Sequence, residues 1–457
     1  EASSKGGQQG NKKVNQPKKK DGDLNVDVVA GKKNSRVNQV AGGESVEKTL
    51  EEKPLDEDDR TLRLFSHLPP YKDPASLEEE FTGIKLGSKS TSSLHPIIIA
   101  LGQKYSSGEI RGGNARCKAM LRAFQIIVAE YTPSPNAKDM RQDLDHKILK
   151  PAFQYWTTRC RIHSVTMGNA FSFFKLAVAN LDRDTSLEDM KEILSETIDA
   201  YIQERIEFAD RAISENASTK IVDGDVILTF AKSDVVESIL INAATSRDQP
   251  RNFRVICVDS RPMLEGRELV QSLTSAGIEC TYTLLNSLSY VMMGEVTKVF
   301  LGAAALMSDG SILSRVGTAC VALMAHSNNI PVLFCCESYK ISTRVQLESI
   351  TGNELGNPQD LVSTKCAFNH YNVPTINRNE ASKDTLYVTT TDRKVLENWQ
   401  NIPNLKLLNL SYDLTPSKFV SGIVTEMGIL PPTSVAVLLR EMNPQDNDST
   451  FRSQVLF

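Results

Sequence analysis

One loop of the sequence carries charged residues in an order that suits the binding of a phosphate-type anion. The loop covers residues 259–267, after a strand expected at Arg254–Val258 and before a helix. Ligands of α/β proteins bind at the carboxyl ends of such strands, where Arg261 could clamp a phosphate beside the amide groups of a helix N-terminus. An equally weighted alternative is that Asp259 and Arg261 brace a tight turn. The pocket residues expected from this loop are Asp259, Ser260, Arg261, Glu265 and Gly266.

A second loop, over residues 302–318, has a similar arrangement. Asp309 and Gly310 predict a turn, and Arg315 and Thr318 stand where a helix is expected to begin. The free amide groups of that helix start form another potential anion site. The simpler interpretation, a turn followed by a helix cap, is favoured for this loop. The pocket residues expected from it are Gly302, Arg315, Gly317 and Thr318.

The sequence lacks the motifs of common nucleotide-binding and hydrolase sites. A dinucleotide-binding protein has G-x-G-x-x-G after its first strand, whereas Thr229–Ser233 contains no glycine. Neither the G-x-x-x-x-G-K-[ST] loop nor G-x-S-x-G occurs. The 8 cysteines form no C-x-x-C pair, and the 6 histidines have no ligand spacing. We therefore expect no cofactor and no metal.

Composition narrows the class of protein further. A net charge of −4 argues against binding of bulk nucleic acid, and we expect no specific nucleic-acid partner. The sequence has no run of about 18 apolar residues and no apolar stretch of signal-peptide type at its N-terminus, so we expect no membrane partner. Most cysteines lie in apolar runs, which fits a reduced setting. We therefore expect a cytosolic, cytoplasmic protein.

Hydrophobic spacing over residues 94–218 predicts a helical bundle domain. One helix is expected to point Arg116, Lys118 and Arg122 away from its apolar face. That face is Cys117, Met120, Leu121, Phe124, Val128 and Tyr131. A later helix is expected to begin after Ser186, a plausible N-cap with Asp189 three positions on. Its apolar face is Met190, Ile193, Leu194, Ile198, Tyr201, Ile202, Ile206, Ala209 and Ile213.

The hydrophobic period changes over residues 219–443, which predicts a Rossmann-like domain with a mostly parallel sheet and hence an α/β fold class. The expected strands are Val226–Phe230, Arg254–Val258, Thr281–Leu285, Lys298–Leu301 and Val332–Cys336. The helices expected between them are Asp234–Ala244, Gly266–Ala276 and Val316–Asn328. The chain is expected to return with a strand at Leu405–Leu410, a helix near Lys418–Met427 and a strand at Ser434–Arg440.

The remaining segments read as polar additions to these two domains. Residues 1–61 form a charged tail that we expect to be disordered, because it has too few large apolar residues to fold. A solvating tail is favoured over a weak RNA or ribosome contact through Lys18–Lys20. Residues 62–93 are expected to form an extended arm that docks through Leu64, Phe65, Leu68 and Tyr71. A polar insertion is expected at about 363–384, and a C-terminal tail at 444–457.

Several motifs, in order, resemble the regulatory subunits of translation initiation factor 2B. They are D-S-R-P-x-x-E-G from Asp259, G-A-x-x-L-x-x-D-G-S-x-x-S-R-V-G-T from Gly302, and the run Pro331–Lys340. Two segments, Ile110–Cys117 and Asn409–Pro416, resemble the delta-type branch in particular. The resemblance covers roughly residues 62–443. It implies an N-terminal helical domain and a C-terminal Rossmann-like domain.

The same resemblance extends to isomerases of methylthioribose-1-phosphate and ribose-1,5-bisphosphate. Those enzymes carry a catalytic cysteine in a T-H-C-x loop and a catalytic aspartate in a G-A-D motif. The matching positions here hold Phe230, Ala231 and Ala304. Isomerisation needs groups that exchange protons with the substrate, and alanine has none. The resemblance therefore implies a protein that is not an enzyme, with a vestigial pocket formed by the two loops above.

The resemblance also implies partners. These are a beta-type subunit in direct contact, the alpha, gamma and epsilon subunits of a guanine-nucleotide exchange factor decamer, and the alpha subunit of initiation factor two, including its phosphorylated form. Candidates for contact with the phosphorylated partner are Arg159, Arg161, Asn169 and Lys175. For each of them a solvated helix face is the favoured alternative. Candidates for the subunit interface are Val332, Phe334, Cys336, Glu337, Tyr339 and Lys340, with Glu337 and Lys340 pairing across it.

Two other functions stay open at this point. The first is a sugar-phosphate or nucleotide sensor that uses the vestigial pocket. The second is a sugar-phosphate isomerase with rearranged catalytic residues, which Ala231 and Ala304 disfavour. A scaffold and regulatory subunit is the favoured interpretation.

Overall fold

The computed structural model describes residues 65–74, 77, 94–135, 137–246, 249–362, 396 and 398–442. The charged tail, the polar insertion, the C-terminal tail and most of the arm that the sequence predicts lie outside the described residues. In the part of the arm that is described, Phe65 and Leu68 are buried. The His67 ring lies 3.2 Å from the Ile350 carbonyl oxygen. This short stretch therefore docks on the body of the protein, as the sequence analysis expects.

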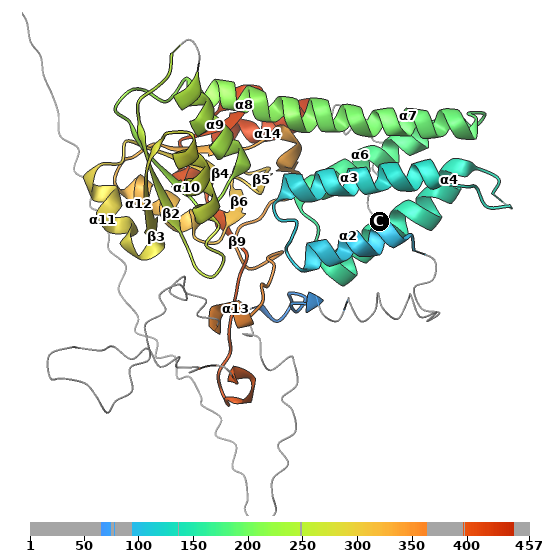
Figure 1. The fold of residues 1–457 in the computed structure, drawn as a ribbon, viewed down its shortest axis with the longest axis horizontal. Coiled ribbons are helices and arrows are strands. Elements are labelled where there is room, and N and C mark those ends of the chain that lie inside the picture. The colour runs from blue at the N-terminus through green and yellow to red at the C-terminus, as the bar shows by residue number, and fades with distance from the viewer. Residues whose placement is uncertain are drawn as a thin grey trace, which may run out of the picture. The chain divides into compact units, whose positions relative to one another are not determined.

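Residues 96–218 form the helical part (Figure 1). Its α-helices are α2 (Pro96–Ser106), α3 (Gly113–Glu130), α4 (Met140–Leu144), α5 (Lys150–Tyr155), α6 (Val165–Asn180), α7 (Leu187–Ala200) and α8 (Phe208–Ser218). Short π-helical turns continue the chain at Asp145–Leu149, Trp156–Cys160 and Tyr201–Glu207. The last of these turns joins α7 and α8 into one long rod in Figure 1.

The predicted faces of these helices are largely confirmed. The Ser186 hydroxyl accepts a hydrogen bond from the Asp189 amide and caps α7, as expected. Ile193 is exposed, although the rest of its expected apolar face is buried. The prediction that Arg116 points away from the core of α3 is wrong. Arg116 is 2% exposed, and its guanidinium lies over the Tyr105 ring, because the long side chain reaches back toward the Ile162 carbonyl.

The sheet part begins at residue 226 and contains a seven-stranded sheet in the order β11-β10-β7-β4-β1-β2-β3. The strands are β1 (Val226–Phe230), β2 (Arg254–Asp259), β3 (Glu279–Leu284), β4 (Lys298–Gly302), β7 (Val332–Cys335), β10 (Gly422–Thr425) and β11 (Gly428–Leu430). All neighbours pair in parallel except β10 and β11. The predicted α/β fold class, with a helical bundle before a mostly parallel Rossmann-like sheet, is confirmed.

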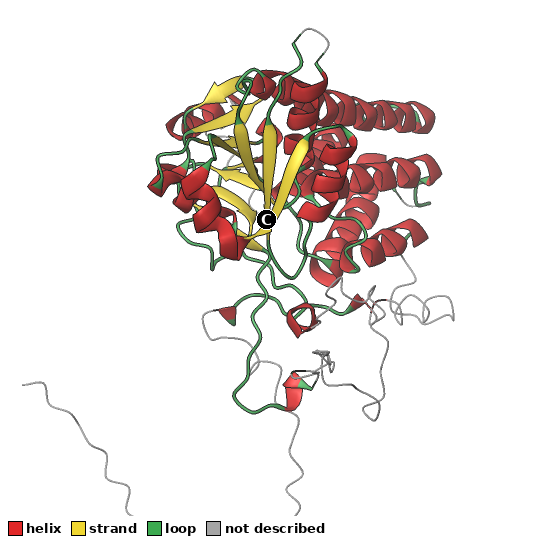
Figure 2. Ribbon diagram, turned by 60° about the vertical axis from the view of Figure 1, so that its left-hand side comes forward, coloured by secondary structure: helices red, strands yellow, loops and turns green. Residues whose placement is uncertain are grey.

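Helices cover both faces of this sheet (Figure 2). One face packs against α8, α9 (Asp234–Thr245) and α10 (Gly266–Ser275), and the other packs against α11 (Leu288–Gly294), α12 (Thr318–Ser327) and α14 (Val435–Met442). Successive side chains of β1 enter opposite cores, because Ile227 packs with the first set and Leu228 with the second. Burial on both faces explains why the inner strands β1, β4 and β7 read as continuous apolar runs.

A small second sheet has the order β8-β5-β6-β9. Its strands are β8 (Ile341–Ser342), β5 (Ala305–Met307), β6 (Ile312–Arg315) and β9 (Tyr412–Thr415). Strand β6 pairs antiparallel with both β5 and β9. This pairing brings the end of the second predicted loop next to a segment almost a hundred residues later.

Three predictions near the C-terminus are wrong. The expected helix near Lys418–Met427 is a single 3-10 turn followed by the buried strand β10. The expected strand at Ser434–Arg440 lies mostly in helix α14, and the expected strand at Leu405–Leu410 forms only an isolated bridge at Leu410. A short apolar run fits a buried strand and a buried helix equally well, because its spacing shows no period.

Candidate functional site

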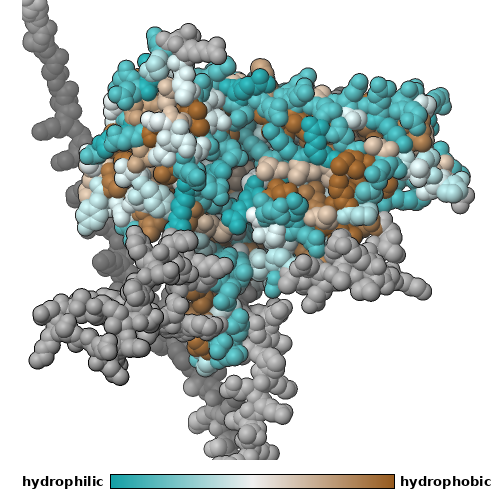
Figure 3. Space-filling model, in the orientation of Figure 1, coloured by the Kyte–Doolittle hydropathy of each residue, from teal (hydrophilic) through white to brown (hydrophobic). Residues whose placement is uncertain are grey.

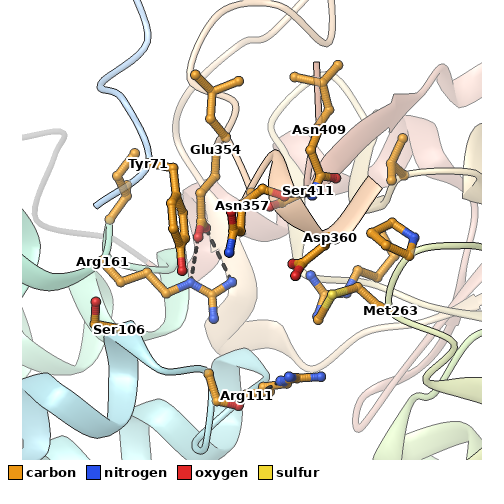
Figure 4. A pocket seen from close by; sticks show the side chains of 18 of the residues that line it. Tyr71, Ser106, Arg111, Arg161, Met263, Glu354, Asn357, Asp360, Asn409 and Ser411 are labelled. Carbon is orange, nitrogen blue, oxygen red and sulfur yellow. Dashed lines mark hydrogen bonds and ion pairs between the residues drawn. The ribbon is translucent and has the colours of Figure 1, made fainter. Parts of the chain in front are cut away.

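A cavity of about 460 Å³ lies where the helical part meets the sheet part (Figure 4). Residues 105–108, Arg111 and residues 157, 158 and 160–162 line it from the helical part, and residues 69–72 line it from the arm. The sheet contributes Phe230 and Ala231 from the end of β1 and residues 259–265 from the end of β2. The loops before β9 contribute residues 354–360 and 409–411. The cavity therefore sits at the carboxyl ends of parallel strands, where ligands of α/β proteins bind.

The loop that follows β2 is braced from inside by Asp259. The buried Asp259 carboxylate accepts hydrogen bonds from the Ser260 amide at 2.9 Å, the Gly266 amide at 2.8 Å and the Tyr282 hydroxyl at 3.1 Å. Burial nevertheless raises its pKa. The turn-bracing interpretation thus describes Asp259, which also lines the cavity together with Ser260, Arg261 and Glu265. Gly266 fits because a Cβ there would lie 2.9 Å from the Asp259 carboxylate.

The anion site predicted at the start of α12 is filled by the chain's own groups. The Asp413 carboxylate accepts the Gly317 amide at 2.7 Å and the Ala319 amide at 3.0 Å. Thr318 donates its hydroxyl proton to the Arg315 carbonyl oxygen, which is an ordinary helix-start contact. Burial raises the pKa of Asp413 to about 6. The favoured interpretation, a turn followed by a helix cap, therefore describes this segment. The capping side chain of α12 is Asp413, which belongs to β9.

Arg315 is paired with Glu265 by two hydrogen bonds. Its Nε lies 2.8 Å from one carboxylate oxygen and its second nitrogen lies 2.5 Å from the other. The guanidinium also lies over the Tyr412 ring. Burial alone would lower the pKa of Arg315, but the Glu265 carboxylate offsets this and the net pKa is raised. The structure thus brings together two predicted pocket residues as an internal ion pair.

A second ion pair, between Arg161 and Glu354, crosses from the helical part to the sheet part (Figure 4). The Arg161 Nε lies 2.5 Å from a Glu354 carboxylate oxygen, and the second guanidinium nitrogen lies 3.4 Å from the other oxygen. Each side chain is 15% exposed. Burial would lower the pKa of Arg161, but Glu354 raises it. The sequence predicts Arg161 at an exposed helix face, and this is corrected, because the side chain points into the cavity.

The end of β1 presents apolar side chains to the cavity. Phe230 and Ala231 line the cavity at the end of β1, and Ala231 has a left-handed backbone with φ of 54°. The Phe230 ring packs against Gly317, which has φ of 108°. A Cβ at Gly317 would collide with that ring, and one at Gly302 would collide with Ser233. These two glycines, predicted as pocket residues, therefore allow close packing rather than line the cavity. Ala304 is also outside the lining.

Some cavity residues escape the sequence analysis. Glu354 carries no local signal, because it follows an asparagine in an irregular loop. Tyr71 belongs to the expected arm but is not predicted in the pocket, and its pKa is raised by burial and then by Asp360 and Asp73. Arg111 and Asp413 lie inside quoted motifs without an assigned role. Their functions depend on which distant segments lie beside them.

The other candidates for a phosphorylated partner lie on or near the surface of the helical part. Arg159 is exposed at the end of the turn after α5. Lys175 lies half-buried on α6, with its ammonium 6.0 Å from the centre of the Phe171 ring. The Asn169 amide donates hydrogen bonds to the Tyr339 and Ile341 carbonyl oxygens, so it ties α6 to the sheet part. Of the four candidates, Arg159 and Lys175 therefore present a charged group that a partner could contact.

The expected subunit-interface residues are buried inside the chain, which corrects that prediction. They are Val332, Phe334, Cys336, Glu337, Tyr339 and Lys340, all less than 9% exposed. Glu337 pairs with Lys340 at 2.7 Å within the chain and accepts a hydrogen bond from the Asn114 amide at 2.6 Å. The run after β7 thus packs against the chain's own helical part. These side chains are therefore covered by residues of the same chain.

The described part of the chain contains no group of three or more His, Cys, Asp or Glu side chains that could hold a metal ion. Among the described helices, none is both long and apolar enough to cross a membrane.

Sequence comparison relates most of the chain to known proteins. Residues 109–432 match the model of the Initiation factor 2 subunit family. Translation initiation factor eIF2B subunit delta of Dictyostelium discoideum is 42% identical over 388 residues, which are 84% of this chain and 57% of that protein. The same subunit of Schizosaccharomyces pombe is 38% identical over 394 residues, which are 86% of this chain and 76% of that protein. The chain thus spans little more than half the length of the Dictyostelium relative.

More distant relatives include enzymes and solved assemblies. Ribose 1,5-bisphosphate isomerase of Pyrococcus furiosus is 24% identical over 346 residues, 75% of this chain and 93% of that protein. A chain of the tetrameric eIF2B-beta2-delta2 complex from C. thermophilum is similar in structure, with a TM-score of 0.63 and 27% identity. The match covers 81% of this chain and 99% of that one. The fold is therefore shared between subunits of an assembly and sugar-phosphate enzymes.

Proposed function

The chain belongs to the initiation factor 2 subunit family, and from this premise we propose that it is a regulatory and scaffold subunit of a guanine-nucleotide exchange factor that acts on translation initiation factor two. It contributes to assembly of the complex and to sensing the phosphorylated alpha subunit of its substrate. The observation that carries the proposal is the extent of similarity to delta subunits, over 84% and 86% of the chain. The proposed site of action is the cytosol.

The chemistry of the cavity supports a role without catalysis. An aldose–ketose isomerase needs groups that exchange protons with its substrate at the reacting atoms. The end of β1 instead presents the Phe230 ring and the Ala231 methyl group to the cavity. The neighbouring Lys232 is paired with Glu268 at 3.0 Å on the surface of the sheet part. Exchange activity would then belong to other subunits of the complex.

Assembly with a beta-type subunit is the most direct consequence. The structural relative with a TM-score of 0.63 is part of a complex that contains beta and delta subunits. We extend this to a decamer that also holds alpha, gamma and epsilon subunits. Because residues 332–340 are buried in the chain, the beta-type subunit must bind other surfaces of the sheet part. Among exposed apolar side chains there, Tyr290 and Met293 lie on α11.

The surface of the helical part supports contact with a protein partner. Phe173, Leu176 and Ile193 are large, exposed hydrophobic residues of α6 and α7. Figure 3 shows hydrophobic residues over this part of the molecule, framed by hydrophilic ones. Lys175 on α6 adds a cation on the helix that carries Phe173 and Leu176. An apolar surface with nearby cations suits a partner that carries a phosphorylated loop.

Native mass spectrometry of the chain co-expressed with a beta-type subunit tests the assembly proposal. We expect a stable complex, and a chain that stays monomeric in the presence of that partner would refute the proposal. An isomerase assay with ribose 1,5-bisphosphate should give no turnover above that of a heat-denatured sample.

Binding of the phosphorylated alpha subunit of initiation factor two tests the sensing proposal separately. Arg159→Glu and Lys175→Glu should each weaken binding by about tenfold, because a charge-assisted contact is replaced by repulsion. Lys220→Glu is the matched control, since Lys220 is exposed beyond the end of α8 in sequence. Equal weakening by all three variants would show that only net charge matters and would refute a specific site.

A further inference from the structure

The two deeply placed arginines of the cavity already hold anions that belong to the chain. Arg161 is bound to Glu354, and Arg315 is bound to Glu265, each through two guanidinium nitrogens. The side chains of both pairs are between 13% and 24% exposed. Such two-point pairing matches the fork of a guanidinium to a carboxylate and is the geometry in which arginine also binds phosphate. The carboxylates thus occupy the positions that a ligand phosphate would need.

The two pairs act as one electrostatic cluster. Arg161 interacts with Glu265 as well as with Glu354, and Arg315 in turn interacts with Arg161. Arg116 also interacts with this cluster. It is buried and forms no salt bridge in the described part of the chain, and burial and Arg161 lower its pKa, although Glu354 acts to raise it. Removal of either glutamate charge would therefore leave several cations close together without compensation.

A third internal carboxylate removes the other anion site of this edge. The Asp413 carboxylate accepts hydrogen bonds from amide groups at the N-terminus of α12, a helix that begins shortly after Arg315 in the sequence. That helix end would otherwise attract an external anion. The helix end and two of the arginines at this edge, Arg161 and Arg315, are thus filled from within.

We propose that Glu265 and Glu354 are specificity-determining residues that act as built-in counter-ions and exclude phosphate-type anions from the cavity. The positions beside Arg161 and Arg315 are then closed to the phosphate group of a ligand. The rest of the lining combines Tyr71, Phe230 and Met263 with polar and charged groups. These are Asn357, Ser411, Lys72, Arg111, Arg261, Asp259 and Asp360. This inference concerns the cavity alone and stands independently of the assembly proposed above.

The expected size of the effect follows from Coulomb's law. A phosphate that entered the cavity would stand next to the Glu265 carboxylate, at about 5 Å, in a partly buried site. At an effective dielectric constant near 20, removal of that one negative charge should tighten anion binding by on the order of a hundredfold. Glu265→Gln keeps an oxygen that accepts a hydrogen bond from Arg315, so the loop keeps one of its contacts. Glu354→Gln is the equivalent change in the second pair.

The test is titration of the full chain with inorganic phosphate and with ribose 5-phosphate. Binding is measured by isothermal titration calorimetry and by the shift in thermal unfolding. Wild-type protein should show no saturable binding up to millimolar concentration. Glu265→Gln, and independently Glu354→Gln, should bind both anions and gain thermal stability in their presence, because a ligand that binds only the folded state stabilises it. The matched control is Glu295→Gln. It removes the charge of a carboxylate that is paired with Arg254 outside the cavity lining.

A double variant decides whether the gained site is the predicted one. Glu265→Gln combined with Arg315→Gln should lose the binding that Glu265→Gln gained, while circular dichroism verifies that each variant is folded. Two results would overturn the proposal. One is wild-type protein that binds phosphate as tightly as the variants do. The other is folded Glu265→Gln and Glu354→Gln proteins that bind it no better than wild type or no better than Glu295→Gln.

Discussion

The buried ion pair between Glu337 and Lys340 offers the sharpest test of how the helical part is attached to the sheet part. The Glu337 side chain is 0% exposed, and its carboxylate contacts the Lys340 ammonium at 2.7 Å. The Asn114 amide of α3 and the Tyr339 hydroxyl donate to the same carboxylate, at 2.6 and 3.2 Å. Burial would lower the pKa of Lys340, but Glu337 raises it, so the lysine is held charged.

Glu337→Ala should destabilise the protein strongly, because it leaves the Lys340 ammonium buried with only the Ala303 carbonyl oxygen, at 3.3 Å, as a described partner. Loss of one member of a buried pair costs about 3–5 kcal/mol, which is a large fraction of the roughly 5–15 kcal/mol that a folded domain has in total. Replacement of both residues by methionine should cost much less, since a well-packed apolar pair has no charge to desolvate.

Equilibrium unfolding in urea measures the effect, with tryptophan fluorescence as the signal. Trp156 is buried in the helical part, and its indole N–H donates to the Ile98 carbonyl oxygen at 2.7 Å. The control is Glu109→Gln, which breaks an exposed pair with Lys104 and should cost less than about 1 kcal/mol. The reasoning fails if Glu337→Ala costs no more than this control, or if the double methionine variant is as unstable as Glu337→Ala.

Three further predictions follow from single contacts. Burial raises the pKa of Asp413 from 3.8 to about 6, so between these pH values the native carboxyl keeps a proton that the unfolded chain has released. The free energy of unfolding should therefore fall as the pH rises from about 4 through 6. Asp413→Asn should flatten this pH dependence in urea unfolding. Gly317→Ala should cost about 1–3 kcal/mol, since φ is 108° and the new Cβ meets the Phe230 ring; a variant as stable as wild type in thermal unfolding would contradict the packing. Ser186→Ala should cost about 1 kcal/mol through loss of the α7 cap, and no change in helix content or urea midpoint would contradict it.

Periodicity alone locates most elements of this fold. The spacing of apolar residues in α3 and the cap at Ser186 are local features, and the structure agrees with both. Four of the short strands between 226 and 336 are recognisable because parallel strands covered on both faces are continuously apolar, whereas the edge strand β3 is largely exposed. The same local information fails for β10 and α14, where short apolar runs near prolines suit either state.

The cavity is harder to predict, because its electrostatics depend on long-range pairing. The sequence points to Arg261, Glu265 and Arg315 as neighbours of one strand edge, and the structure places all three in the lining. It does not predict that Glu265 neutralises Arg315. The predicted interface run, with Glu337 and Lys340, also reads as exposed charge from sequence, whereas the helical part covers it.

The sequence alone predicts the α/β architecture, the order of the helical and sheet parts, and the presence of alanine at positions 231 and 304. These properties depend on residue type and local spacing. The pairing of Arg161 and Arg315 with carboxylates depends on the tertiary structure. Arg161 meets Glu354 across 193 positions and Asp413 caps α12 across 96, so these contacts exist only after distant segments have packed together. Charge at a site is a sum over spatial neighbours, and the local rules that identify a helix or a loop contain no information about them.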